Sequence, residues 1–341
     1  MPRLLKLGTS LLGLSAAASA SPHGLAKRDE CETLRQVKAW TNFTSTEKSA
    51  YIDAALCLTT AEPTIGLGDS ATVWQEMQYA HIGQVTWIHN VGQFLPWHRY
   101  FVTVHANFLR DLCGYEGPLA YWDESADAQL TDLTDAEIFQ ADAFGGDGVG
   151  SSKCIEDGPF VDTVLHPVNT TGSGGNSSAT NGNTCIWRSL SLNSLDRSSY
   201  VNVETCLEKD TWEGAWNCIE GSPHGGGHGG VGGVMLNVAN SPGDPLFFLH
   251  HSFIDLLWWR WQSADLDTRL TEISGINSQS QSSCDRQGLP CAGPEILDYD
   301  GDDGNQTTLN HVLWMMDLSP NVTVADVMNT NSSSVCLEYI W

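Results

Sequence analysis

Histidine is unevenly distributed along this chain, and that distribution constrains the fold more than any other feature. Eight of the eleven histidines lie in two short segments, and only one lies between residues 106 and 223. The first group is His81, His89, His98 and His105, and the second is His224, His228, His250 and His251. Each group can supply three imidazoles to one metal ion, and all-imidazole sites suit copper, zinc, iron or nickel. The remaining three, His23, His166 and His311, are expected to be ordinary surface residues.

The spacing within each group predicts how the imidazoles are arranged. His224 and His228 are four residues apart, so they share one helix face. Phe247, His251 and Asp255 also share one face, whereas the residue before His251 points about 100° round the helix. His89 and His98 are nine apart and would lie on opposite faces of one helix, so they need separate elements. Pro96 supplies the break, with His89 on a loop or helix end and His98 in the first turn of the next helix.

Charge and composition exclude several classes of protein. The chain has 16 Lys and Arg against 41 Asp and Glu, a formal charge of −25, whereas nucleic-acid binders carry a basic face. The same charge disfavours docking on anionic membranes. Apolar residues make up 41% of the sequence and include 13 Trp, so a sizeable core is expected. We therefore expect a globular protein whose partners are neither nucleic acids nor membranes.

The N-terminus has the pattern of a secretory signal. Arg3 and Lys6 precede an apolar run, and residues 18–20 are a small-residue cleavage site. The dibasic pair at 27–28 then suggests processing, which gives a signal peptide over 1–20, a propeptide over 21–28 and a mature domain over 29–341. No later stretch is long and apolar enough to predict a transmembrane helix. Six glycosylation sequons fit export: Asn42, Asn169, Asn176, Asn305, Asn321 and Asn331.

Ten cysteines, an even number, fit several disulfides in an oxidising compartment. Cys284 and Cys291 are close enough for a local bridge, and Cys154 and Cys185 flank a long loop, but spacing leaves the full connectivity open. We therefore expect a secreted protein.

Apolar periodicity predicts one mostly helical domain with long loops. Helices are expected over 29–40, 45–58, 70–81, from Pro96 to about 112, and from Phe247 to about 262. Pro96 and Pro245 would each occupy the first helical position, with Asp244 as the cap of the last helix. Residues 144–184 are rich in Gly, Ser, Asn and Thr and read as a surface insertion, and the tail over 312–340 is expected to pack on the body.

Two motifs in this chain resemble those of a known family. Residues 94–100 read Phe-Leu-Pro-Trp-His-Arg-Tyr, and residues 244–251 read Asp-Pro-Leu-Phe-Phe-Leu-His-His, four residues before Asp255. They resemble the two copper signatures of tyrosinases and catechol oxidases, the type-3 copper proteins, which share the pattern with molluscan haemocyanin. Shorter segments similar to the same family lie at residues 113–115, 121–123, 258–262 and 336–339. The chain is most similar to short secreted fungal tyrosinase-like proteins.

This resemblance implies a four-helix bundle around a dinuclear copper site, with few short strands. It places three imidazoles on each of two copper ions: His81, His89 and His98 on one, and His224, His228 and His251 on the other. Phe247 would pack over the centre, Asp255 would orient Arg99 or a ligand imidazole, and Gly225 and Gly229 would border the substrate pocket. The activity implied is oxidation of small phenols with O2 as co-substrate. The oligomeric state stays open.

The chain also departs from the family. Ala106 stands where many relatives carry Glu, and Leu256 stands where Arg often follows the Asp. Gly225 stands where strong tyrosinases often place an Asn that orients a water for monophenol deprotonation. We therefore expect oxidation of o-diphenols or o-aminophenols to o-quinones or quinone imines, with weak or no hydroxylation of monophenols.

Three alternatives remain from the sequence alone. The first is a true tyrosinase, and the second is a haemocyanin-like O2 carrier with a closed mouth. The third is a zinc hydrolase or a metal-free secreted protein.

Overall fold

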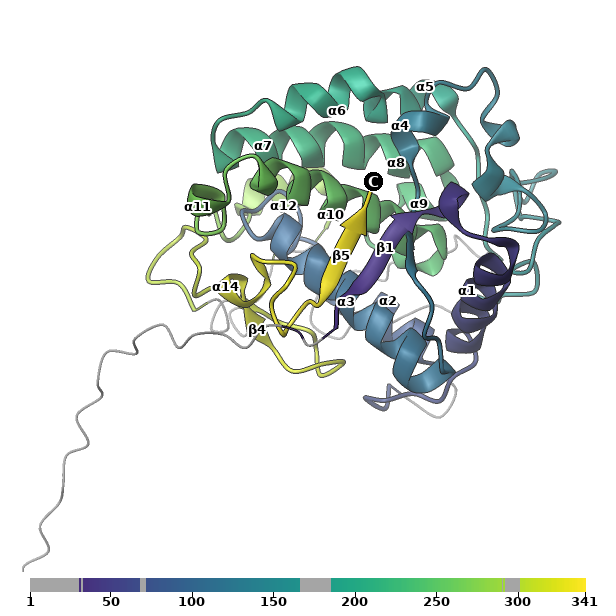
Figure 1. The fold of residues 1–341 in the computed structure, drawn as a ribbon, viewed down its shortest axis with the longest axis horizontal. Helices are drawn as coiled ribbons and strands as arrows, with labels where there is room; N and C mark the ends of the chain where they lie inside the picture. The colour runs from purple at the N-terminus through teal and green to yellow at the C-terminus, as the bar shows by residue number, and fades with distance from the viewer. Residues whose placement is uncertain (1–30, 32, 68–71, 166–184, 290, 292–300) are drawn as a thin grey trace, which may run out of the picture.

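The structure is a computed structural model that describes residues 31, 33–67, 72–165, 185–289, 291 and 301–341 (Figure 1). The signal peptide and propeptide expected over 1–28 lie outside these residues. The longer helices are α1 (Ser45–Leu58), α2 (Val73–Gly83), α3 (Phe94–Cys113), α6 (Tyr200–Leu207), α7 (Trp212–Ile219), α8 (Gly225–Val231), α10 (Leu246–Ser263) and α12 (Gln281–Gln287). The fold is mainly helical, as expected.

Short elements connect these helices. The one-turn helices are α4 (Glu124–Asp127), α5 (Leu192–Leu195), α9 (Gly233–Leu236), α11 (Leu266–Arg269) and α14 (Val324–Val327). The 3-10 turns are η1 (Trp40–Asn42), η2 (Leu133–Asp135), η3 (Glu137–Phe139), η4 (Asp196–Ser198) and η6 (Ser241–Gly243), whereas η5 (Glu220–His224) is a π-helical turn that continues into α8. The strands are β1 (Arg35–Ala39), β2 (Leu119–Tyr121), β3 (Val312–Leu313), β4 (Val322–Thr323) and β5 (Leu337–Ile340). The described part of the 144–184 segment forms only turns and isolated bridges, in line with a surface insertion.

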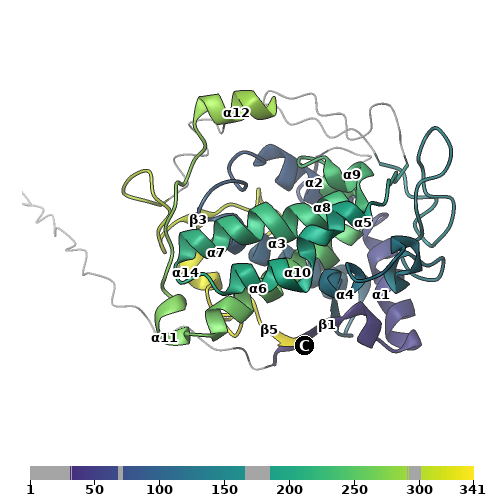
Figure 2. The ribbon, with the colours of Figure 1, turned by 90° about the horizontal axis from the view of Figure 1, so that it is seen from above.

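The crossing of α3 and α10 forms the centre of the molecule (Figure 2). Helix α3 begins at Phe94 rather than at Pro96, because a proline anywhere in the first turn costs no intrahelical hydrogen bond. It ends at Gly114, which has the left-handed conformation typical of a helix C-terminus. Helix α10 begins at Leu246, and Asp244 still accepts from the Leu246 N–H at 3.0 Å. Both expected helices are therefore present, with starts displaced by one or two residues.

The expected helix over residues 29–40 is wrong, because Arg35–Ala39 forms the strand β1. Strand β1 lies between β2 and β5 and pairs in parallel with both. Val37 and Ala39 are buried while Gln36 is exposed, which is the period-two pattern of a half-buried strand. Pairing partners more than 80 residues away, at 119–121 and 337–340, decide this structure. The tail packs on the body through β5, as expected.

All ten cysteines are paired, which fits the oxidising compartment expected. The bridges are Cys31–Cys336, Cys57–Cys113, Cys154–Cys185, Cys206–Cys218 and Cys284–Cys291. The two pairings suggested by spacing are thus confirmed.

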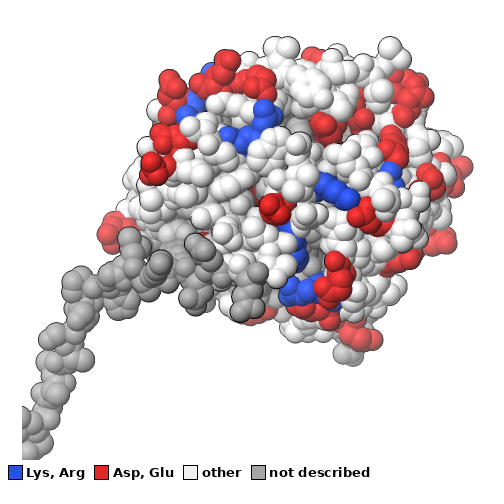
Figure 3. Space-filling model, in the orientation of Figure 1, with Lys and Arg blue, Asp and Glu red and all other residues white. Residues whose placement is uncertain are grey.

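Acidic side chains are spread over the surface, with few basic ones between them (Figure 3). Among the described helices, none has the length and apolar character that a membrane crossing requires.

Candidate metal centre

The first histidine trio comes from α2, the turn after it, and α3. Ring centroids of His81, His89 and His98 lie 5.0–5.7 Å apart. Each ring directs Nδ1 at a main-chain carbonyl: His81 at Ala239 (3.0 Å), His89 at Val85 (2.8 Å) and His98 at Phe94 (2.8 Å). A carbonyl only accepts, so each Nδ1 carries the proton and each Nε2 keeps its lone pair. The trio therefore presents metal-binding nitrogens in a fixed tautomer. His98 is the fifth residue of α3, one turn later than expected.

The second trio is built on the continuous η5–α8 helix and on α10. His224 and His228 share one face of that helix, as their spacing predicted, and their Nε2 atoms are 3.1 Å apart. The Nδ1 of His224 points at its own helix (Glu220 O, 3.2 Å) and that of His228 at Met235 O (2.7 Å). His251 is buried, and neither of its ring nitrogens has a hydrogen-bond partner among the described residues. Two protons are thus placed by main-chain carbonyls, while His251 is held by packing.

A fourth imidazole, His250, lies beside the second trio, with its ring centroid 4.4 Å from that of His228. Its Nδ1 donates to the carboxylate of Glu124, which also accepts from the Ser198 hydroxyl (2.7 Å). His250 and Glu124 are fully buried, and His250 Nε2 has no partner in the described protein. The ligand-type atoms of His224, His228, His250 and His251 all lie within 4.8 Å of one another. Sequence reasoning missed Glu124, although it directly follows the motif at 121–123.

The two trios face each other across α3 and α10. The rings of His98 and His251 are stacked, with centroids 4.3 Å apart and planes 9° apart. Phe247 is fully buried between the trios, 4.2 Å from the His251 centroid and 5.2 Å from that of His81. The arrangement brings all six predicted ligand histidines together, and Phe247 packs against them.

Asp255 supports this centre through Arg99 rather than through a ligand imidazole. Arg99 Nε donates to Asp255 Oδ1 at 2.5 Å, and both side chains are buried. The other oxygen of Asp255 accepts from the Tyr339 hydroxyl on β5. The guanidinium also donates to the carbonyls of Val327 and Met328 (both 3.0 Å). A buried charge pair needs such additional hydrogen bonds to offset its desolvation. The pair therefore ties α3 to α10 at the residue after His98.

Burial sets the protonation of the histidines. Desolvation lowers the pKa of all six trio imidazoles, to about 4 for His89, and it lowers the pKa of His250 to about 3. Neutral imidazole is the form that binds a metal ion. Imidazole is a suitable ligand for copper. The site fits that metal because its donors are all imidazole nitrogens and because the Nε2 atoms of His81 and His98 have no hydrogen-bond partner among the described residues.

The glycines of α8 contact a neighbouring segment instead of bordering open space. A Cβ on Gly229 would be 3.0 Å from Ser194, and one on Gly225 would be 3.2 Å from the Arg197 guanidinium. A Cβ on Gly227 would be 2.3 Å from His250 Nδ1 and 2.5 Å from Glu124 Oε1. The glycine run is thus required for close packing on residues 194–198 and on the Glu124–His250 pair.

Two carboxylates near the centre differ in position. Glu213 is exposed, 3.5 Å from the Ser274 hydroxyl. Glu220 precedes His224 by one turn and accepts from the Asn90 N–H (2.6 Å) and from Trp216 Nε1 (2.7 Å). Desolvation raises the pKa of Glu220 to about 8. Of these two acids, Glu220 is therefore the one that lies next to a ligand histidine.

Other positions of interest lie away from the trios. Ala106 and Leu256, where the sequence departs from the family pattern, are apolar core residues. The neighbouring His105 is buried and stacks on Phe248, with ring centroids 3.8 Å apart. The expectation that His311 is a surface residue is wrong, because it is fully buried and its Nδ1 donates to Asp302 at 2.7 Å.

Comparisons with known proteins agree with this centre. The common central domain of tyrosinase matches residues 71–264, which include both trios. Tyrosinase ustQ of Aspergillus flavus is 29% identical over 325 residues, covering 91% of this chain and 80% of the relative. N-acetyl-6-hydroxytryptophan oxidase ivoB of Emericella nidulans is 29% identical over 318 residues, covering 76% and 83%.

Solved structures show the same fold. A glycine-to-asparagine variant of the polyphenol oxidase from Thermothelomyces thermophila superposes with a TM-score of 0.71 at 24% identity, covering 90% of this chain and 89% of that one. A functional unit of octopus hemocyanin gives 0.52 at 18% identity, with 90% and 68% covered. With two facing histidine trios, this fold and a central-domain match over more than half of its length, the chain belongs to the tyrosinase family of type-3 copper oxidases.

Proposed function

We propose that this protein is a secreted dicopper oxidase that uses O2 to oxidise o-diphenols or o-aminophenols, with slow or absent hydroxylation of monophenols. The observation that carries the proposal is the pair of facing trios, in which main-chain carbonyls hold the proton on Nδ1 of five imidazoles and leave each Nε2 lone pair for a metal. His81, His89 and His98 would hold one copper, and His224, His228 and His251 the other. When bound, the two metals supply two electrons to O2 and take two from each phenol.

The protein's own residues supply the metal ligands, set the distance between the trios and exclude solvent. The stacked pair His98 and His251 sets the separation of the trios, and Phe247 fills the space between them. His224 and His228 are the most exposed ligands, at 7% and 8%, so a phenol approaches from the side of the η5–α8 helix. Two o-diphenols and one O2 then yield two o-quinones and two waters, so the electrons balance without a further reductant.

Monophenols are expected to be poor substrates because their oxidation begins with loss of a phenolic proton of pKa about 10. A positioned base or ordered water assists that step. Gly225 has no side chain that could orient such a water. The nearby carboxyl of Glu220 already accepts two N–H groups, and its raised pKa of about 8 makes it a weakly populated base at neutral pH. These features favour o-diphenols and o-aminophenols, whose rings already carry two neighbouring donor groups.

An oxygen-uptake panel on the copper-loaded mature protein tests the proposal. The substrates are catechol, o-aminophenol, tyrosine and a bulky phenol, and metal analysis accompanies each preparation. We expect about two coppers per chain, fast uptake with catechol or o-aminophenol, and slow or lagging uptake with tyrosine. Tyrosine turnover as fast as catechol turnover, without a lag, would make the protein a true tyrosinase. Reversible O2 binding without catechol oxidation would identify an O2 carrier, and zinc in place of copper would reject the oxidase.

Secretion is tested separately. N-terminal sequencing of protein from the medium should begin near residue 29, and glycosidase treatment should lower its apparent mass. Active, unglycosylated protein that retains Met1 would contradict this part of the proposal.

A further inference from the structure

A surface pocket of about 540 Å³ opens beside the first histidine trio. Its lining residues are Asn90, Ile276, Ser278, Gln279, Ser280, Ser283, Arg286 and Asn305. Six of them belong to α12 or to the segment that leads into it, and α12 stands on the side of the bundle where α2 and α9 also lie (Figure 2). None of these residues is a predicted metal ligand, so the pocket is separate from the centre already described.

The pocket is connected to the centre through residues 89 and 90. Asn90 is the only exposed residue between positions 72 and 110, so the chain reaches the surface here, one residue after the ligand His89. Gln279 Nε2 donates to the His89 carbonyl at 2.7 Å, which fixes the pocket wall to the ligand's own backbone. The Asn90 N–H donates to Glu220, one helical turn before the ligand His224. Asn90 therefore borders both the pocket and the exposed side of the centre.

The charge of this pocket is unusual for the protein. Arg286 is exposed on its wall, and no acid is among the lining residues. Within the part of the chain that the structure describes, Arg286 forms no ion pair with a carboxylate. In a chain of 41 acids and 16 bases, a pocket whose described lining residues carry a positive charge and no negative one stands out as a place where an anion is favoured.

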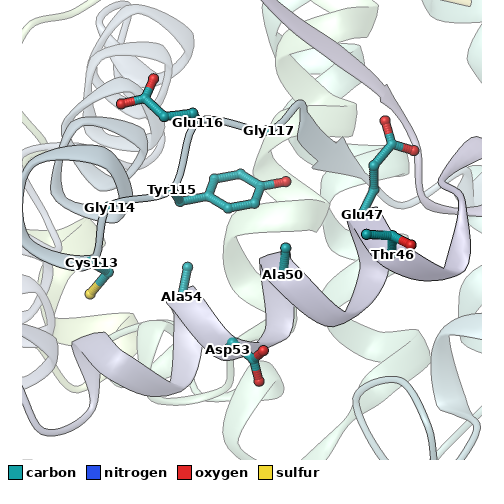
Figure 4. A pocket seen from close by; sticks show the side chains of 10 residues that line it. All are labelled: Thr46, Glu47, Ala50, Asp53, Ala54, Cys113, Gly114, Tyr115, Glu116 and Gly117. Atoms are coloured by element: carbon teal, nitrogen blue, oxygen red, sulfur yellow. The ribbon is translucent and has the colours of Figure 1, made fainter.

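Three other surface pockets have the opposite charge. The one in Figure 4, between α1 and the turn after α3, is lined by Glu47, Asp53 and Glu116 and by no Lys or Arg. The two neighbouring pockets beside residues 59–60 both contain Asp162 and likewise no Lys or Arg. The charge beside His89 is therefore a local property and does not reflect the general surface.

We propose that this pocket binds a carboxylate on the substrate's side chain, so that the preferred substrates are o-diphenols or o-aminophenols that carry a carboxylic acid. The proposal rests on the phenol-oxidase function above. A guanidinium binds a carboxylate through two parallel N–H donors, and Arg286 is the lining side chain that offers them. Ser280 and Ser283 also line the pocket, but their hydroxyls are already bonded within the start of α12 and to Gln279. Ile276, 43% exposed, offers apolar contact to the carbon chain between the ring and the acid. The ring would reach the centre past Asn90 while the acid stays at Arg286.

The test compares two substrates that differ only in charge, 3-(3,4-dihydroxyphenyl)propionate and its primary amide, on copper-loaded protein. The wild type should show a KM about fivefold lower for the acid than for the amide, which matches a partly exposed ion pair. Arg286→Gln should remove that difference by raising the KM of the acid, with kcat changed less than twofold and the amide unaffected. Arg260→Gln, at a partly buried arginine that pairs with Glu204, is the matched control and should leave both KM values unchanged. Protein is deglycosylated first, because the sequon residue Asn305 lies on the pocket wall.

A second measurement avoids turnover. Non-oxidisable 3-phenylpropionate should bind the metal-free protein by calorimetry, more weakly at high salt, and Arg286→Gln should abolish that binding. Equal KM values for acid and amide in the wild type, or an unchanged KM ratio in Arg286→Gln with a native melting temperature, would overturn the carboxylate site. Oxidation of catechol itself by the wild type is independent of this result, so failure of the pocket and failure of the oxidase function are distinguishable.

Discussion

The two histidine clusters have the same number of predicted ligands but are built in different ways. All three imidazoles of the first are oriented by main-chain carbonyls, and they come from residues 81–98. In the second, main-chain carbonyls orient His224 and His228 as well, but His251 from another helix has no such acceptor among the described residues. Beside it lies His250, which is oriented by the carboxylate of Glu124. Main-chain acceptors persist when side chains are substituted, whereas a side-chain acceptor does not. Substitutions of neighbouring side chains should therefore change the geometry of the second cluster more than that of the first.

The supporting helix explains this difference further. Helix α8 contains Gly at five of its seven positions, and each Gly costs a helix about 1 kcal/mol relative to Ala. Such a helix forms because its glycines allow close contact with residues 194–198 and with the Glu124–His250 pair. The position of His228 thus depends on packing between segments, while that of His98 depends on a helix with a strong apolar face.

Loss of a ligand should have the largest effect and tests the assignment directly. His98→Ala and His251→Ala should each remove one copper and nearly all oxidase activity, because each leaves its metal with two imidazoles. His250→Ala should keep more copper and activity, since its Nδ1 serves Glu124. Metal content and oxygen uptake measure these outcomes. Equal copper loss in the His250 and His251 variants would show that the choice of His251 is wrong.

Gly227→Ala should weaken the second cluster without touching a ligand. Its Cβ would overlap the hydrogen bond between Glu124 and His250, and overpacking of this kind costs about 1–3 kcal/mol. We expect a lower free energy of unfolding and an affinity for one copper reduced about tenfold, as for other outer contacts of metal ligands. Gly221→Ala is the control, because a Cβ there meets no atom within 4 Å. Equal loss of both coppers would contradict the expectation that this substitution affects only the second cluster.

Acid should release copper only at low pH. Burial lowers the pKa of the trio histidines, to about 4 for His89. The imidazoles therefore stay neutral above that pH, where protons compete little with copper for their nitrogens. Copper content after dialysis should be constant from pH 7 to pH 5 and should fall near pH 4. Half-loss near pH 6.5, the ordinary histidine value, would indicate solvated ligands instead. If the two copper ions are released at different pH values, their order shows which cluster binds copper more weakly.

The smallest effect concerns monophenols. Gly225→Asn should raise the ratio of monophenol to diphenol oxidation severalfold, because an amide could orient a water beside the second cluster. The new Cβ also presses on Arg197, so Gly225→Ala, which makes the same contact without an amide, is the control. Initial rates on tyrosine and catechol give the ratio. An equal rise in both variants would attribute the change to Arg197 rather than to the amide.

Local patterns in the sequence determined much of this centre. The spacing of His224 and His228 and the break at Pro96 predicted which imidazoles share a helix, because helix periodicity is a property of a few consecutive residues. The motif around His251 led to its selection over His250 before any contact was known. The helices around both trios were likewise predictable, and their ends shifted by only one to three residues.

Contacts between distant segments decided the rest, because they have no signal within a short stretch of sequence. Arg35–Ala39 is a strand only because residues 119–121 and 337–340 pair with it. His311 is buried, and its Nδ1 donates a hydrogen bond to Asp302, nine residues earlier. Glu124 becomes part of the centre, and the glycines of α8 become contacts rather than open space, only once residues 194–198 and 250 lie against them. The sequence by itself predicted which imidazoles lie together as candidate ligands, because helix spacing is local, whereas the tertiary structure decided which side chains hold them in place.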